Sequence, residues 1–303
     1  MTSIHDRIKG CLMGLMCGDA LGSPIEFKTP EQLAARFPQG VRGMEAGWGS
    51  TAGRVRGEIT DDSEMALSLL DSLVQEGGFH VACVRQAYID WLDSDPPDAG
   101  TTIRAALWLH EDTSKSEANG ALMRIAPLAI WGALHPEVDV LIDAALDAKL
   151  THTHPKCAVA NVVYVAAVKA ALLGHTREEI YSSALKLAEQ FSPEIHALLL
   201  AAADREPDYY PLPGWLHHAL QAAFYQLLHA ESFEQGLCAV VNRLGDPDTN
   251  GAIAGALLGA YFGESAIPAA WREAVLSARL DRPEQYSARY ADQLLARLLH
   301  PQP

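Results

Sequence analysis

Two short stretches of the sequence place carboxylates and a hydroxyl where a helix is expected to begin. Residues 57–62 (GEITDD) and residues 245–249 (GDPDT) both follow a glycine turn and lead into an apolar-periodic segment. The first turn of a helix has unpaired N–H groups, so oxygen-bearing side chains gather there. We interpret the two stretches as halves of one metal site. The candidate ligands are Thr60, Asp61, Asp62, Asp246, Asp248 and Thr249.

Helix capping is the simpler explanation for each stretch alone, because Asp and Thr are favoured N-caps and acids suit the helix dipole. Elsewhere the sequence predicts reciprocal capping boxes, in which a Glu or Gln follows three residues after the cap. These pairs are Thr29 with Gln32, Thr176 with Glu179, and Ser232 with Gln235. Thr60 and Thr249 have Ser63 and Ala252 at that position, so neither is boxed.

The second stretch also matches the opening of an EF-hand calcium loop. Its twelfth position is Leu257, where the loop requires a bidentate Glu, so we reject the EF-hand interpretation. The oxygens of both stretches still require a cation. An all-oxygen ligand set favours Mg²⁺, Mn²⁺ or Ca²⁺ over Zn²⁺.

Composition predicts one large helical domain over residues 1–303, since 49% of the residues are hydrophobic and no linker divides the chain. The formal charge of −15 argues against broad binding to nucleic acids or anionic membranes. An anionic substrate remains compatible with this charge, because bound divalent cations invert the local sign.

The cysteines favour a reducing compartment. There are five, an odd number, and no two form a C-x-x-C pair. The first residues lack the pattern of a signal peptide, and the longest apolar run, 162–168, is too short to span a bilayer. We therefore expect a cytoplasmic protein without a membrane span.

Apolar residues recur at helical rather than strand spacing, which predicts an all-α fold with almost no strand. Helices are expected at about 5–18, 61–76, 80–93, from Thr101, after Arg124, from His135, and at 155–173, 176–190, 193–204, 214–229, 233–243, 249–263 and 284–299. Residues 38–59 are predicted to form a long loop.

Two of these helices have glycines at a spacing of four, at positions 10, 14 and 18 and at 251, 255 and 259. Such a spacing puts the glycines on one face, where bare backbone lets another helix approach closely. Because an interior glycine costs about 1 kcal/mol relative to alanine, we expect both faces to pack in the core, against one another or another helix.

Two further residues leave alternatives open. Asp98 precedes the helix expected at Thr101, so it is either the cap of that helix or part of a site. Arg124 lies among apolar residues, which favours a buried ion pair, with a site carboxylate as one candidate partner; a surface position is the alternative.

The order of these motifs resembles that of the ADP-ribosylglycohydrolases, above all the dinitrogenase-reductase-activating branch, which removes ADP-ribose from arginine. The resemblance covers residues 5–264. It rests on 18–22 (GDALG) with Glu26, 60–62 (TDD), Asn119 and Gly120 with Arg124, Thr151 with His152, and the second acidic stretch.

The resemblance implies a compact orthogonal helical domain around a dinuclear Mg²⁺ or Mn²⁺ cleft, with the six candidate ligands already named. It implies that Glu26 and Asp98 are the catalytic carboxylates. It also implies substrate-binding roles for Ser116, Asn119, Gly120, His152, Tyr209 and Tyr210.

The function implied is a metal-dependent hydrolase that reverses mono-ADP-ribosylation of protein arginine. Serine, a nucleic-acid base or a small molecule remain alternative carriers of the ADP-ribose. An inactive binding or structural relative is a further alternative, but such a protein should have lost ligands that are present here. The substrate would be an ADP-ribosylated protein, of which a nitrogenase iron protein is one candidate.

Overall fold

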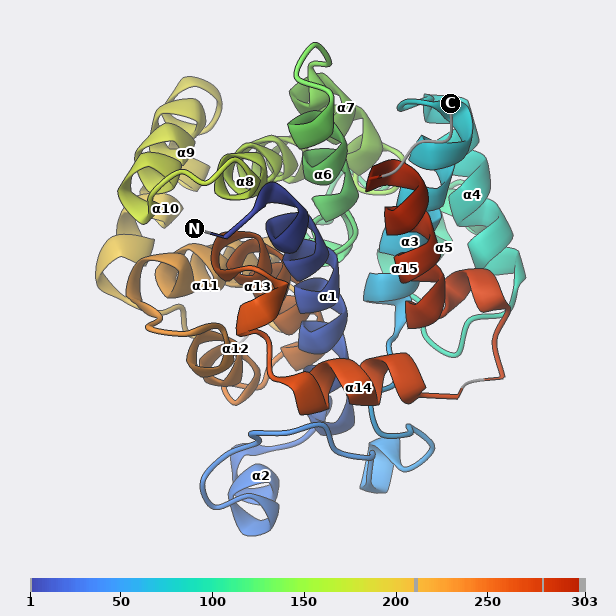
Figure 1. Ribbon diagram of the computed structural model, residues 1–303, viewed down its shortest axis with the longest axis vertical. Helices are drawn as coiled ribbons and strands as arrows, with labels where there is room; N and C mark the ends of the chain where they lie inside the picture. The colour runs from blue at the N-terminus through green and yellow to red at the C-terminus, as the bar shows by residue number, and fades with distance from the viewer. Residues whose placement is uncertain (1, 210–211, 280, 300–303) are drawn as a thin grey trace.

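A computed structural model describes residues 2–209, 212–279 and 281–299, and in these ranges it has helices and no strand (Figure 1). The all-α prediction is confirmed. The α-helices are α1 (Ile4–Gly22), α2 (Pro30–Arg36), α3 (Asp61–Glu76), α4 (Val81–Asp93), α5 (Thr101–Arg104), α6 (Ala126–Leu134), α7 (Val140–Lys149), α8 (Pro155–Leu172), α9 (Arg177–Phe191), α10 (Pro193–Asp204), α11 (Leu216–His229), α12 (Phe233–Val241), α13 (Pro247–Phe262), α14 (Ala269–Ser277) and α15 (Ala288–Leu299).

The central feature of the fold is the contact between α1 and α13, which lie side by side in the middle of the molecule (Figure 1). The prediction that both glycine faces pack in the core is confirmed, and of the two arrangements expected they face one another. A Cβ on Gly14 would lie 2.2 Å from the carbonyl oxygen of Gly255, and a Cβ on Gly18 would lie 2.0 Å from that of Gly251. Backbone-to-backbone contact along both helices therefore explains why these interior positions are glycine.

Replacing Gly14 with alanine is expected to lower the free energy of unfolding by about 2 kcal/mol or more. The added methyl group overlaps backbone rather than a movable side chain, and overpacking outweighs the gain in helix propensity. Urea unfolding measures the difference. Gly43→Ala is the matched control, because a Cβ there meets no atom within 4 Å. Equal stability of the two variants would contradict the packing role.

Most predicted helices exist, but several boundaries differ. The helix expected at His135 begins only at Val140, because Asp139 accepts a hydrogen bond from the N–H of Leu141 as its cap. The segment 284–299 is a short 3₁₀ turn followed by α15, and α14 was not predicted. Long loop structure between α2 and α3 is confirmed, with one 3₁₀ turn at Gly49–Thr51.

The capping predictions separate ordinary helix starts from the two acidic ones. Thr29 and Thr176 form complete capping boxes, whereas Gln235 bonds the N–H of Glu231 instead of that of the Ser232 cap. The caps of α3 and α13, Thr60 and Asp246, cap no N–H of their own helix with their side chains. Neither side chain is therefore used to cap the helix that it precedes.

Helix α8 is the one helix in the described ranges with the length and apolar composition of a membrane span. Of this 18-residue segment, 56% is buried inside the protein. It packs against α6, α7, α9 and α13 (Figure 1). These contacts are those of a core helix.

Candidate active site

The start of α3 is held by a carboxylate from α1. Asp19 is fully buried, and its Oδ2 accepts hydrogen bonds from the N–H groups of Thr60 (2.8 Å) and Ser63 (3.2 Å). The Thr60 hydroxyl donates to Asp19 Oδ1 at 2.9 Å and lies 3.1 Å from Asp62 Oδ2. Asp19 thus caps α3 from another helix. That arrangement leaves Asp61 and Asp62 without a capping role.

The start of α13 is fixed by the glycine contact with α1. A Cβ on Gly22 would lie 2.3 Å from the backbone nitrogen of Asp248, so the end of α1 touches the first turn of α13. Asp246 precedes that turn, and its Oδ2 accepts a hydrogen bond from Asn119 Nδ2 at 2.6 Å. The close packing of α1 and α13 therefore brings the two acidic helix starts to the same place.

A cleft of about 280 Å³ opens where these elements meet. We call it the acidic cleft. The predicted site residues that line it are Glu26, Asp61, Asp98, Asn119, Gly120, His152, Asp246, Asp248 and Thr249. Thr60 and Asp62 lie behind this lining and are buried, with Thr60 bonded to Asp19. Residues separated by more than 200 positions in the sequence thus converge, as the sequence predicted.

Arg54 is the site residue that sequence reasoning missed. Its guanidinium donates to Glu26 Oε2 at 2.9 Å and to Asp98 Oδ2 at 2.8 Å, so it joins two carboxylates of the acidic cleft. It comes from the glycine-rich loop before α3, where no helical spacing indicates its direction. The one available signal was that five clustered carboxylates need positive charge.

Burial and mutual repulsion raise the pKa values of the clustered acids. Burial is the largest cause, and neighbouring carboxylates add to it for Asp61, Asp62 and Asp248, whose pKa values rise well above the usual range. Burial followed by the Asp98 charge raises the pKa of Glu26 to about 7, although Arg54 opposes the change. The folded protein therefore stores unfavourable charge in this cleft when no cation other than Arg54 is near.

The donor set fits a hard divalent cation, since it consists of carboxylate and hydroxyl oxygens. Asp62 Oδ1 is buried without a hydrogen-bond partner in the described part of the protein, which is the condition expected of an oxygen reserved for a ligand. Within residues 2–209, 212–279 and 281–299, however, no three His, Cys, Asp or Glu side chains form a ready-made ligand shell. Binding a cation there therefore requires these side chains to rearrange.

The other side of the cleft is neutral. His152 is buried, and burial followed by the charge of Arg124 lowers its pKa to about 3. Its ring packs over Gly120, where a Cβ would lie 3.1 Å from His152 Cε1. The fully buried Arg124 donates to Asp147 Oδ1 at 3.0 Å and to the carbonyl oxygen of Gly120 at 3.3 Å. The predicted buried ion pair is confirmed, but its partner is not a cleft carboxylate.

The remaining predicted residues are placed differently. Asp98 is not a helix cap, because Gly100 precedes α5 and Asp98 contacts Arg54 instead. Ser116 does not line the cleft, but its hydroxyl bonds that of Thr102, which does, at 2.8 Å. Tyr209 does not line the acidic cleft, since the residue is buried, with its backbone and Cβ next to Gly245 and its ring beside that of His218. Tyr210 lies outside the described residues.

Comparisons with known proteins agree with this fold and cleft. The chain matches the family model described as ADP-ribosylglycohydrolase over residues 1–302. An ADP-ribosyl-[dinitrogen reductase] glycohydrolase of Rhodospirillum rubrum is 33% identical over 97% of each chain. The ADP-ribosylarginine hydrolase Tri1 of Pseudomonas putida (strain GB-1) is 28% identical, over 89% of this chain and 74% of its own.

A solved structure titled "ADP-ribosylglycohydrolase-related protein complex" has a TM-score of 0.78 and 30% identity, and the match covers 98% of this chain and 99% of that chain. The fold and the family match define a hydrolytic enzyme of the all-α class. The chain belongs to the ADP-ribosylglycohydrolase family. The resemblance stated from the motifs is thereby confirmed.

Proposed function

We propose that the protein is a metal-dependent hydrolase that removes ADP-ribose from modified arginine in proteins. The observation that supports it most is the convergence on one cleft of two acidic helix starts, those of α3 and α13, whose own N-cap side chains bond no helix N–H. The names of two similar proteins, from Rhodospirillum rubrum and Pseudomonas putida, point to ADP-ribosylated dinitrogen reductase and ADP-ribosylarginine as substrates of those proteins. The free thiols of the chain fit a cytoplasmic location.

The ligands of this proposal are the six residues at the two helix starts, and two Mg²⁺ or Mn²⁺ ions would fill the site. Such ions supply Lewis-acid stabilisation and orient a ribose hydroxyl or a water molecule. The chain itself supplies contacts for the substrate. Asn119 is anchored by its bond to Asp246, and Gly120 and His152 form a neutral wall that accepts a ribose or diphosphate without repulsion.

Proton transfer is assigned to Glu26 or Asp98. Cleavage of an N-glycosidic bond proceeds through an oxocarbenium-like transition state, and the leaving guanidine must gain a proton. Both carboxyl groups line the acidic cleft and share Arg54, so both are within reach of one bound substrate. Arg54 orients the two groups and restrains the loop that contains it.

Replacing Glu26 with glutamine is expected to lower turnover by roughly 10²–10⁴-fold, the range of general acid–base catalysis, while Mn²⁺ binding is retained. The amide keeps the shape of the side chain but cannot exchange a proton. Steady-state release of ADP-ribose gives the rate, and calorimetric Mn²⁺ titration gives the binding. Glu31→Gln on the neighbouring α2 is the control. Unchanged turnover in Glu26→Gln would assign proton transfer to Asp98.

The linkage is tested with a pair of peptides that differ only in the residue bearing ADP-ribose, arginine or serine, in the presence of Mn²⁺. The proposal predicts release from arginine and little or none from serine. Preferential release from serine would overturn the arginine assignment and retain the hydrolase. No release from either peptide, nor from ADP-ribosylated nucleic acid or free ADP-ribosyl compounds, would support an inactive relative.

A further inference from the structure

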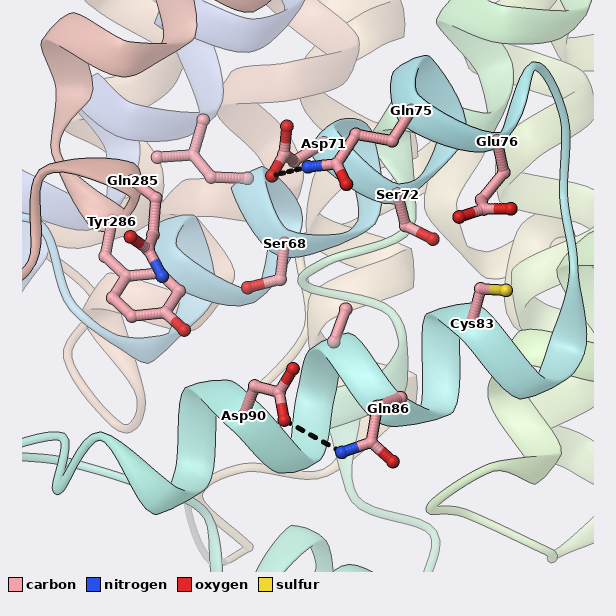
Figure 2. A pocket seen from close by; sticks show the side chains of 12 residues that line it. Ser68, Asp71, Ser72, Gln75, Glu76, Cys83, Gln86, Asp90, Gln285 and Tyr286 are labelled. Atoms are coloured by element: carbon pink, nitrogen blue, oxygen red, sulfur yellow. Dashed lines mark hydrogen bonds between the residues drawn. The ribbon is translucent and has the colours of Figure 1, made fainter.

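A second cavity lies between α3 and α4, where the 3₁₀ turn Glu284–Tyr286 closes one side (Figure 2). Its volume is about 390 Å³, in the range of small-molecule sites. The cavity uses the second half of α3, Leu67 to Glu76, whereas the acidic cleft uses the first turn. The two cavities share no lining residue among those described.

The floor of this cavity has a hydroxyl group without a partner. Ser72 is 7% exposed, and its Oγ has no hydrogen-bond partner within the described part of the protein. Figure 2 shows the side chain directed from α3 into the space before α4. A buried hydroxyl left unpaired is destabilising, so an occupant that bonds it would recover the lost hydrogen-bond energy.

Three of the donors around the cavity are bonded to neighbouring residues. The amide nitrogen of Gln75 donates to Asp71 at 2.6 Å, and that of Gln86 donates to Asp90 at 2.8 Å (Figure 2). The hydroxyl of Ser68 donates to the carbonyl oxygen of Glu64 at 2.8 Å. These side chains offer a ligand several acceptors, namely carboxamide oxygens, carboxylate oxygens and hydroxyl lone pairs.

The charge of the cavity also favours a ligand with N–H donors, and specifically a cation. Asp71, Glu76 and Asp90 line it, and no described Lys, Arg or His does. No three acidic, His or Cys side chains of the described ranges are arranged to hold a metal ion, and the cavity is far larger than a bare ion. An organic cation with several N–H donors satisfies both the charge and the acceptors.

We propose that this cavity, named here the α3–α4 cavity, binds a guanidinium or ammonium group. The cation lies between the rim carboxylates of Glu76 and Asp90 and donates a hydrogen bond to Ser72 at the floor. Its source is either a free amine such as a polyamine or an arginine side chain of a protein. This inference is independent of the reaction at the acidic cleft.

The test is isothermal titration of the Mn²⁺-loaded, full-length protein with agmatine and, separately, with spermidine and a capped peptide containing one arginine. Saturable binding of at least one ligand is expected. Binding of the peptide as tight as that of agmatine assigns the site to a protein side chain. Binding of only the free amines assigns it to small molecules. Failure of all three to bind at about millimolar concentration would overturn the proposal.

Two variants with matched controls locate the site. Glu76→Gln/Asp90→Asn is expected to weaken binding at least about tenfold, equivalent to 1.4 kcal/mol. Glu189→Gln/Asp204→Asn changes the net charge equally on α9 and α10, remote from the cavity, and is expected to leave the affinity within about twofold. Equal loss in both double variants would show general electrostatic attraction and overturn the site.

Ser72→Ala separates binding from structure. Because the hydroxyl has no partner in the folded protein, its removal should leave the Tm unchanged or higher while the affinity falls. Asp61→Ala should leave the affinity unchanged. Binding that survives Ser72→Ala intact, or that disappears in Asp61→Ala, would contradict the assignment to the α3–α4 cavity.

Discussion

Replacing Asp61 with alanine is expected to lower the release of ADP-ribose at least about 10³-fold, because bound metal supplies several kcal/mol of transition-state stabilisation in sites of this kind. Asp61 lines the acidic cleft, and it is Asp19 of α1 that accepts the hydrogen bonds at the start of α3. Asp61 therefore has no capping function whose loss could explain inactivity. The measurement is the initial rate with an ADP-ribosyl-arginine peptide at saturating Mn²⁺.

The stability of this variant distinguishes loss of function from loss of fold. Burial and neighbouring carboxylates raise the pKa of Asp61, so its ionised form destabilises the metal-free protein at neutral pH. Asp61→Ala in the presence of a chelator should accordingly unfold at the same or a higher urea concentration than the unmodified protein. Asp292→Ala, exposed on α15, is the control for the activity. Retained activity in Asp61→Ala would contradict its assignment as a ligand.

Replacing Arg124 with methionine is expected to cost about 3–5 kcal/mol of unfolding free energy, the cost of breaking a buried ion pair from one side. Arg124 and Asp147 are both 0% exposed. The guanidinium also lies 4.4 Å from the ring centroid of Tyr88, whose hydroxyl donates to Asp147 Oδ2 at 2.7 Å. Its loss leaves a carboxylate with one remaining side-chain donor in an apolar core. Urea unfolding at neutral pH measures the cost.

Asp147→Asn added to Arg124→Met provides the control, because it removes the stranded charge. The double variant should regain a substantial part of the lost stability. Activity should fall in the single variant even at urea concentrations at which it is still folded. The reason is that Arg124 also donates a hydrogen bond to the carbonyl oxygen of Gly120 at the wall of the cleft. A cost below about 1 kcal/mol would contradict the structural role of the pair.

Most helices, and the burial of both glycine faces, could be predicted from the sequence because the signals are local and periodic. Glycines at a spacing of four on two helices indicate a close helix contact, and Gly14 and Gly255 are in contact in the structure. Acidic helix starts without a capping box, at α3 and α13, likewise predicted their convergence. Boundaries were less certain, as at Val140, since they depend on which of several nearby residues caps the helix.

Features set by long-range packing could not be predicted in the same way. Arg54 acts from an irregular loop, where spacing does not reveal direction. Asp19 caps a helix 41 residues further along the chain, a pairing with no local signature. Tyr209 was expected to bind substrate at the cleft, yet its side chain is buried elsewhere. Burial of an aromatic ring is favourable in itself and has no signature in the local sequence. In each case the partner is fixed by tertiary contacts.

The acids of the two helix starts are proposed to hold divalent cations. The most direct test of this proposal is a calorimetric titration of chelator-treated protein with Mn²⁺, performed on the unmodified chain and on Asp61→Ala/Asp248→Ala. We predict saturable binding of two Mn²⁺ per unmodified chain and a higher Tm in the bound form. The double variant should bind fewer ions or none. Absence of binding to the unmodified chain, or identical stoichiometry and affinity in the double variant, would contradict the account.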